Sequence, residues 1–213
     1  MKYFCLIFLA LGLLGGCSEV NVFSKSDLFP HIGKRVAIFP VKPQGHLPES
    51  VWKPLAARYD SALSQFSSFS HVLTEQEQNE LTRENPLLRQ QIHRYTTTAA
   101  LTMISDKDLV HELAPMLAAD QFLIVQAEEY PCTEDCPAPS QVLLRLILWD
   151  TASNQIIWRG RLHRQLTPNE EDPEMFNALM QELNEQLLET FQEQFRIPWH
   201  RLRYENLKKL RSS

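Results

Sequence analysis

Hydrophobic and polar residues alternate along the chain with two different periods. Runs rich in β-branched and aromatic residues, or alternating with a period of two, are typical of strands. They predict four strands: Lys34–Val41, Gln121–Glu129, Gln141–Asp150 and Gln155–Arg164. His71–Thr74 is a further, short candidate strand. The turn Thr151–Asn154 joins the last two strands into a hairpin.

Apolar residues three or four positions apart predict helices around these strands. One stripe predicts a helix that either has Pro54 in its first turn or begins there; its members are Val51, Leu55, Tyr59, Leu63 and Phe66. Capping signals open two more helices, at Thr74 with Glu77 and at Asn85-Pro86. A segment at 109–119 is expected to break at Pro115, and a stripe that repeats every four residues predicts a long helix at Pro173–Phe195.

The order of these elements predicts the fold class. Apolar helix stripes need a sheet to cover, and strands and helices are interleaved. We expect a single α/β sandwich of two or three layers with a mixed sheet of about four strands. A C-terminal hairpin followed by a long helix completes it.

The amino terminus has the organisation of a signal peptide. The positive start Met1-Lys2 precedes an uncharged run, Tyr3–Leu14, which is too short to span a bilayer as a helix. Leu14-Gly15-Gly16-Cys17 then resembles the lipobox of bacterial lipoproteins. The resemblance implies cleavage before Cys17, diacylglycerol on its thiol and a further acyl chain such as palmitate on its amino group. The residue after this cysteine is Ser18 and not aspartate, which resembles the pattern of lipoproteins that are sorted to the outer membrane.

Two other interpretations of this segment stay open: an ordinary secretory signal with a chance cysteine, or an uncleaved anchor. In the lipoprotein interpretation, two or three acyl chains anchor the chain stably. The domain organisation is then a signal peptide at 1–16, a polar tether at 17–33, an α/β periplasmic domain at 34–195 and a basic tail at 196–213.

Cys132 and Cys136 are the two cysteines that follow the anchor. An exported protein meets an oxidising compartment, and the surrounding prolines and Asp135 mark a turn, so we expect a disulfide that clasps the loop between two strands. A redox-active pair is the alternative, although the spacing differs from CxxC. A zinc site would need about four ligands, and the sequence supplies no second pair.

The sequence carries no familiar motif of catalysis or cofactor binding. Six glycines build neither a GxGxxG nor a phosphate-binding loop, and the seven histidines never stand four residues apart. No GxSxG or SxxK surrounds a serine. We therefore expect a protein that is not an enzyme, with no metal and no cofactor.

The net charge of −5 hides an uneven distribution of charge along the chain. Residues 196–213 hold six basic residues and one acidic residue, while the body is acidic. One interpretation is a solvated tail; the other is contact with an anionic surface through residues that include Arg201, Arg203, Lys208 and Lys209. An acidic body and an export signal argue against nucleic acid as a partner.

Three passages resemble one family of envelope domains. Arg35–Val41 resembles the opening strand of the domain shared by the curli-secretion lipoprotein, the TolB amino-terminal domain and the lipoprotein activators of penicillin-binding proteins. Leu113–Val125 is similar to the "helix, Ala-Asp, strand" passage, with Ala118 in place of the usual glycine, and Leu146–Gly160 is similar to the closing hairpin. The likeness covers roughly residues 34–165. It implies a periplasmic partner-binding module, and the chain has no room for pore-forming hairpins.

Together these features predict an outer-membrane lipoprotein that faces the periplasm and binds another envelope protein. We expect the binding surface on the sheet face that carries Phe122 and Ile124. The runner-up is a lipid or small-ligand carrier, which would need a deep apolar pocket. A cluster of His, Asp and Ser in one cleft would favour an enzyme.

Overall fold

The computed structural model describes residues 20–41, 47–130, 140–167 and 172–196. Within these ranges six strands form one open sheet. In their order across the sheet they are β1 (Val20–Ser24), β6 (Gln155–Gln165), β5 (Gln141–Asp150), β4 (Gln121–Tyr130), β2 (Lys34–Val41) and β3 (Phe69–Leu73). β2 runs parallel to β3 and β4, and all other neighbours are antiparallel, so the predicted mixed sheet is confirmed.

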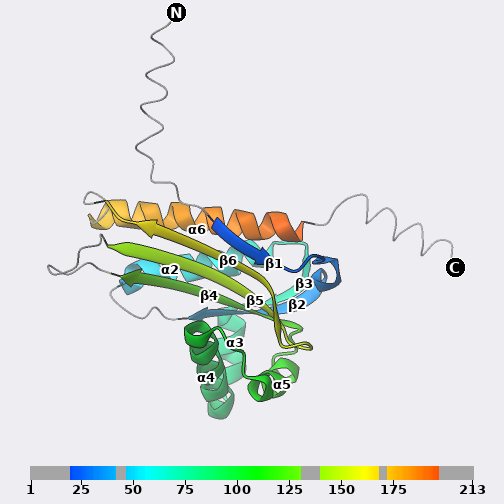
Figure 1. The fold of residues 1–213 in the computed structure, drawn as a ribbon. Coiled ribbons are helices and arrows are strands. Elements are labelled where there is room, and N and C mark those ends of the chain that lie inside the picture. Colours follow the sequence, from blue (N-terminus) through cyan, green and yellow to red (C-terminus); the bar gives the residue numbers. More distant parts are fainter. Residues whose placement is uncertain (1–19, 42–46, 131–139, 168–171, 197–213) are drawn as a thin grey trace, which may run out of the picture.

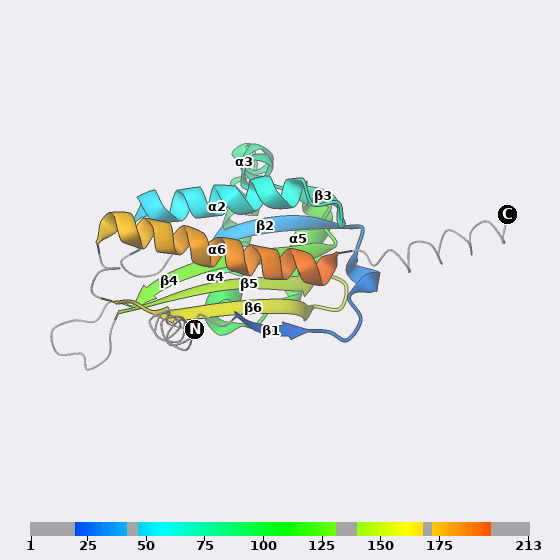
Figure 2. The ribbon, with the colours of Figure 1, turned by 90° about the horizontal axis from the view of Figure 1, so that it is seen from above.

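Helices cover both faces of this sheet. α2 (Glu49–Ser64) and α6 (Pro173–Phe195) lie side by side over one face (Figures 1 and 2). The opposite side carries α3 (Glu75–Arg83), α4 (Pro86–Thr102) and α5 (Lys107–Met116) (Figure 1). A short 3-10 helix, η1 (Phe29–His31), lies between β1 and β2. The sandwich therefore has three layers. Among the described residues, no helix combines the length and the apolar character that a membrane crossing needs.

The expected number of about four strands is wrong. β3 confirms the short candidate strand, and β1 lies within the range 17–33, where irregular structure was expected. β1 has only five residues, and its partner β6 lies more than 130 residues further along the chain. So short a run carries little periodicity of its own, and pairing with β6 makes it a strand.

Two separate buried clusters hold the layers together. Successive side chains of a strand point to opposite faces, so each central strand contributes to both clusters. β4 places Leu123 and Val125 under α2 and α6. It places Phe122 and Ile124 under α4 and α5.

The predicted binding surface at Phe122 and Ile124 is therefore not a surface. Both side chains are 0% exposed. The ring of Phe122 lies 5.1 Å from that of Phe39 and 5.2 Å from that of Tyr95, both in edge-on contact. The sequence pattern shows that this face of β4 is apolar, but the packing of α4 and α5 buries it.

Local signals place most helix ends correctly. The capping box that opens α3 is confirmed, because Glu77 N–H donates to the Thr74 hydroxyl and Thr74 N–H donates to the Glu77 carboxylate. α5 ends at Met116, one residue after Pro115, as expected. Pro54 is the exception: α2 begins at Glu49, so the proline lies beyond the first turn and not within it or at the helix start, and Val51 and Trp52 are buried before it.

Ala118 has a backbone φ of 47°, in the left-handed region that favours glycine. It is exposed and leads from α5 into β4. Ala118→Gly is expected to stabilise the domain by about 1 kcal/mol, because it relieves this backbone strain. Thermal unfolding followed by circular dichroism should then show a Tm about 2–4 °C higher. An unchanged or lower Tm would contradict this account of the turn.

Candidate functional site

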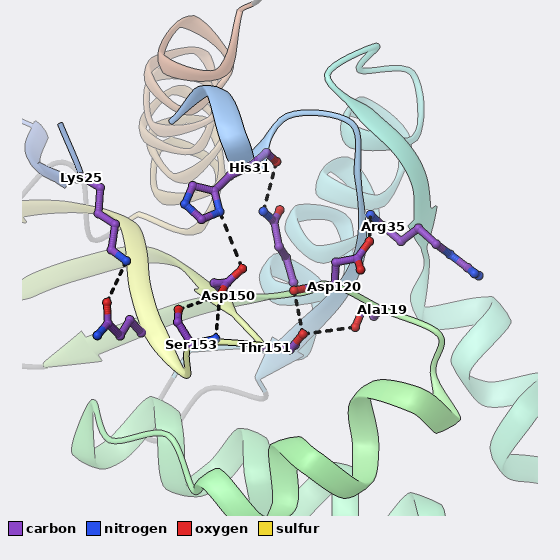
Figure 3. A network of polar contacts seen from close by, with 10 residues as sticks. Lys25, His31, Arg35, Ala119, Asp120, Asp150, Thr151 and Ser153 are labelled. Atoms are coloured by element: carbon purple, nitrogen blue, oxygen red, sulfur yellow. Dashed lines mark hydrogen bonds and ion pairs between the residues drawn. The ribbon is translucent and has the colours of Figure 1, made fainter. Parts of the chain in front are cut away.

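A network of polar side chains lies at the end of the sheet where β2 and β4 begin and β5 ends. It joins three segments that are far apart in the sequence (Figure 3). Gln121 Nε2 donates to the His31 carbonyl oxygen at 3.0 Å, and His31 Nδ1 lies 3.7 Å from Asp150 Oδ1. Ser153 donates to Asp150 Oδ2 through both its backbone N–H and its hydroxyl, at 2.8 Å and 2.6 Å. Because it brings histidine, aspartate and serine together, this network is a candidate catalytic site.

The order of the side chains does not suit nucleophilic catalysis. A Ser-His-Asp triad needs histidine between the serine and the aspartate, so that it can take the hydroxyl proton. Here Asp150 stands between Ser153 and His31: its Oδ2 accepts from Ser153, and its Oδ1 lies 3.7 Å from His31 Nδ1, beyond hydrogen-bond distance. Burial lowers the pKa of His31, and the neighbouring Asp150 opposes that effect. The serine hydroxyl bonds to a carboxylate that shapes the β5–β6 turn, so the network is structural.

Asp120 performs a similar structural task next to this network (Figure 3). Its carboxylate accepts a hydrogen bond from Arg35 N–H at 3.0 Å, and its own N–H donates to the Arg35 carbonyl oxygen at 2.9 Å. Its carbonyl oxygen accepts from both the N–H and the hydroxyl of Thr151. Asp120 thus ties the starts of β2 and β4 to the β5–β6 turn.

A groove on the other half of the sheet is more suited to binding. It has a volume of about 530 Å³, and we call it the arginine groove because three arginines line it. Its lining residues are Asn21, Val22, Phe23, Met103, Arg145, Arg159 and Arg161. The cluster under α4 and α5 reaches β5 and the first residues of β6 but includes no residue of β1. The outer strands β6 and β1 therefore keep polar and aromatic side chains exposed on that face.

The charges of the arginine groove are only partly compensated. Arg145 and Arg161 lie directly opposite one another in the β5–β6 register, an arrangement of like charges that costs stability. Arg145 Nη2 lies 3.9 Å from Glu128 Oε2, and Arg145 also donates to Gln126 Oε1 at 3.4 Å. Within the described ranges, Arg159 and Arg161 have no ion pair. The groove therefore presents positive charge to a ligand.

Solved structures similar to this chain include those of three bacterial proteins. The C-terminal domain of LpoB from Salmonella enterica has 14% identity and a TM-score of 0.40, with coverage of 63% of this chain and 84% of that one. The PelC dodecamer from Paraburkholderia phytofirmans has 13% identity and a TM-score of 0.42, with coverage of 81% and 96%. Lipoprotein GNA1162 from Neisseria meningitidis has 14% identity and a TM-score of 0.41, with coverage of 73% and 96%. No protein-family model and no curated protein matches the chain.

Acylation of Cys17 stays a prediction, because Cys17 lies outside the described residues. The same holds for the disulfide between Cys132 and Cys136 and for the tail residues Arg201, Arg203, Lys208 and Lys209.

Two larger grooves bear on the carrier hypothesis. One of about 760 Å³ lies between α2 and α3, and its lining includes six charged side chains: Glu49, Lys53, Asp60, Glu75, Glu80 and Arg83. Another of about 770 Å³ lies between α4 and α5 and is lined mainly by polar and charged residues. Neither is the deep apolar pocket that a lipid carrier needs. In the part of the chain that the structure describes, no cluster of His, Cys, Asp or Glu is arranged to hold a metal.

Asp60 gives the α2–α3 groove a pH dependence. Burial raises its pKa to about 6, and the charges of Glu75 and Glu77 add to the increase, while a hydrogen bond from Glu75 N–H opposes it. The folded protein therefore binds more protons than the unfolded chain between pH 4 and 6, so this contribution to stability is present at low pH and is lost as pH rises through 6.

Asp60→Asn is expected to stabilise the protein at pH 7 by about 1 kcal/mol relative to wild type, since solvent screens this half-buried group. At pH 4 the two proteins should be about equally stable, because Asp60 is then protonated. Urea unfolding at pH 4, 5, 6 and 7 would measure the difference between them. A difference that stays constant with pH would contradict the raised pKa.

The sequence pattern did not predict the arginine groove, although it contains one signal for it. Arg159 and Arg161 stand two residues apart, so both point to the same face of a strand. Arg145 and Phe23 join them only through the registers of β5–β6 and β1–β6. Those registers are not readable from the sequence alone.

Proposed function

We propose that this chain is a lipid-anchored lipoprotein of the bacterial envelope that acts by binding another envelope protein, without catalysis. Its role would be that of an accessory module in an assembly or secretion system. The binding surface would be the arginine groove with the adjoining edge of β1. The groove is the observation that carries the proposal, because arginine and aromatic side chains that stay partly or fully exposed are typical of protein interfaces.

Exposed apolar side chains at the edge of the sheet support this choice of surface. Val22 is 42% exposed and Phe23 is 47% exposed, and both belong to the edge strand β1. Arg159 lies over the Phe23 ring, with its guanidinium carbon 5.8 Å from the ring centre. An aromatic ring with an arginine beside it is the kind of residue pair that contributes most to protein binding.

The amino-terminal sequence supports the location. The lipobox Leu14–Cys17 with Ser18 favours anchoring in the outer membrane, with the domain on the periplasmic side. The basic tail 196–213 is proposed as a second contact with an anionic surface, through residues that include Arg201 and Lys208.

Site-specific photo-crosslinking in the bacterium that makes this lipoprotein tests the proposal. A photoreactive phenylalanine analogue at position 23 should yield an adduct of defined mass that contains one envelope protein. The matched control places the analogue at Leu87, which is 64% exposed but lies on α4. The Leu87 position should give no such adduct.

Reversal of charge in the groove sharpens this test. With Arg159→Glu and Arg161→Glu present together, the adduct at position 23 should fall at least tenfold. Recovery of lipid alone at position 23, or of the same protein equally from positions 23 and 87, would overturn the proposal.

A further inference from the structure

The outer edge of β1 offers unpaired backbone groups. β1 is the last strand of the sheet, with β6 on one side and no described strand on the other (Figure 2). Lys25 N–H donates to the Ile157 carbonyl oxygen at 3.0 Å, directly after the β1–β6 register. Hydrogen bonding alternates along an antiparallel ladder, so Asn21 and Phe23 bond to β6 while the N–H and C=O of Val22 point to the free edge.

β1 lacks most of the devices that usually protect a sheet edge. Natural edges are blunted by short strand length, charged residues, proline or a β-bulge, and β1 has only the first of these. The five residues of β1 are Val-Asn-Val-Phe-Ser, and their register with β6 is uninterrupted. At the opposite edge, β3 pairs with β2 through a register shift between Lys34 and Arg35 and carries His71. In the part of the chain that the structure describes, β1 is thus the edge that is open to another strand.

The arginine groove gives this edge a preference for negative charge. Arg159 lies opposite Phe23 in the register and extends over the Phe23 ring, so its guanidinium group reaches toward the edge. A strand added to β1 would lie about 4.8 Å beyond it. Carboxylates at alternate positions of that strand would then stand on the same face as Arg159 and Arg161.

We propose that β1 takes an extended acidic segment of the partner protein as a seventh strand of the sheet. The segment carries carboxylates at alternate positions on the arginine face and apolar side chains on the face of Val22. This inference rests on the proposed function and names the chemistry of the partner. Backbone hydrogen bonds to the edge supply affinity, and the arginines supply selectivity.

The position of the lipid anchor limits where that segment must be. Val20 lies three positions after Cys17, with two residues between them, and so short a stretch spans at most about 11 Å. In an acylated protein, β1 therefore lies close to the membrane surface. The acidic segment belongs to a protein that reaches this membrane.

Two designed peptides test strand addition directly. The first is a capped, fluorescent heptapeptide of alternating Val and Glu, and the second has the same sequence with N-methyl groups that remove backbone donors from one edge. Binding to the mature lipoprotein in detergent, followed by fluorescence anisotropy, should be at least tenfold tighter for the first. Equal binding of the two would overturn the proposal, because the N-methylated peptide keeps the charge that the basic tail could attract.

Variants of the protein provide a second test of strand addition. Val22→Pro removes only an N–H that points to the free edge, so the β1–β6 ladder is kept and the Tm should stay within a few degrees. The acidic peptide should bind this variant at least tenfold more weakly, whereas Val22→Thr should bind it as wild type does. Arg159→Glu with Arg161→Glu should reverse the preference toward a Val-Lys peptide.

Two results separate this inference from the proposed function. If the protein adduct at position 23 persists in Val22→Pro cells, protein binding stands and strand addition is wrong. If the wild-type protein binds vesicles that contain phosphatidylglycerol but neither peptide, the groove recognises lipid headgroups and the inference is overturned.

Discussion

Phe122→Ala is expected to destabilise the domain by about 3–5 kcal/mol, the cost of removing a fully buried aromatic side chain. Phe122 is 0% exposed and packs edge-on against Phe39 and Tyr95, with ring centres 5.1 Å and 5.2 Å away. Its removal leaves a cavity between the sheet and α4 that this rigid cluster cannot fill. Urea unfolding followed by circular dichroism would measure the loss.

Phe23→Ala is the matched control, because it removes the same side chain from a surface position. Phe23 is 47% exposed, so the expected loss is below about 1 kcal/mol. The same variant should weaken crosslinking and peptide binding at the arginine groove, whereas Phe122→Ala should affect them only through unfolding. Equal losses of stability from the two variants would contradict the burial of Phe122 and would indicate that its side chain is exposed.

Gly160→Ala is expected to destabilise the domain by about 2–3 kcal/mol through overpacking. Gly160 lies on β6 under α6, and a Cβ built there would stand 2.7 Å from Leu187 Cδ1 and even nearer to the Trp158 ring. Its φ lies outside the left-handed region, so alanine fits the backbone and the cost is steric. Chemical denaturation of the variant, compared with wild type, would measure it.

A double-mutant cycle separates this steric cost from a general weakness of the strand. In the background of Leu187→Ala, one of the two clashing groups is absent, so Gly160→Ala should cost less than it does in wild type. The same cost in both backgrounds would show that the clash with Leu187 does not carry the effect.

The closing hairpin illustrates how far a sequence pattern carries. The run Gln141–Asp150, apolar on both faces except at Arg145, and the segment Gln155–Arg164 predict both strands and the turn between them, because each signal lies within a few residues. The segment Ile156–Gly160 has a glycine two residues after a tryptophan. Only the packing of α6 explains why: Gly160 leaves room for the Trp158 ring and Leu187.

β4 marks the limit of such patterns. Its two apolar faces are visible in the sequence, but a pattern cannot tell which faces helices cover. The stripes of α4 and α5 are compatible with either face of a sheet. The expected exposure of Phe122 and Ile124 was wrong for this reason, and tertiary packing decided their burial.

The sequence by itself determined the local elements of this protein. Strands, helices and caps depend on residues close together in the chain, so their signals are local. The tertiary structure alone decided that Val20–Ser24 is a strand and that Arg145 and Arg161 lie opposite one another in the groove that Phe23 also lines. These features depend on strand register between segments far apart in the chain, and register is set by the burial of whole faces rather than by any neighbouring residue.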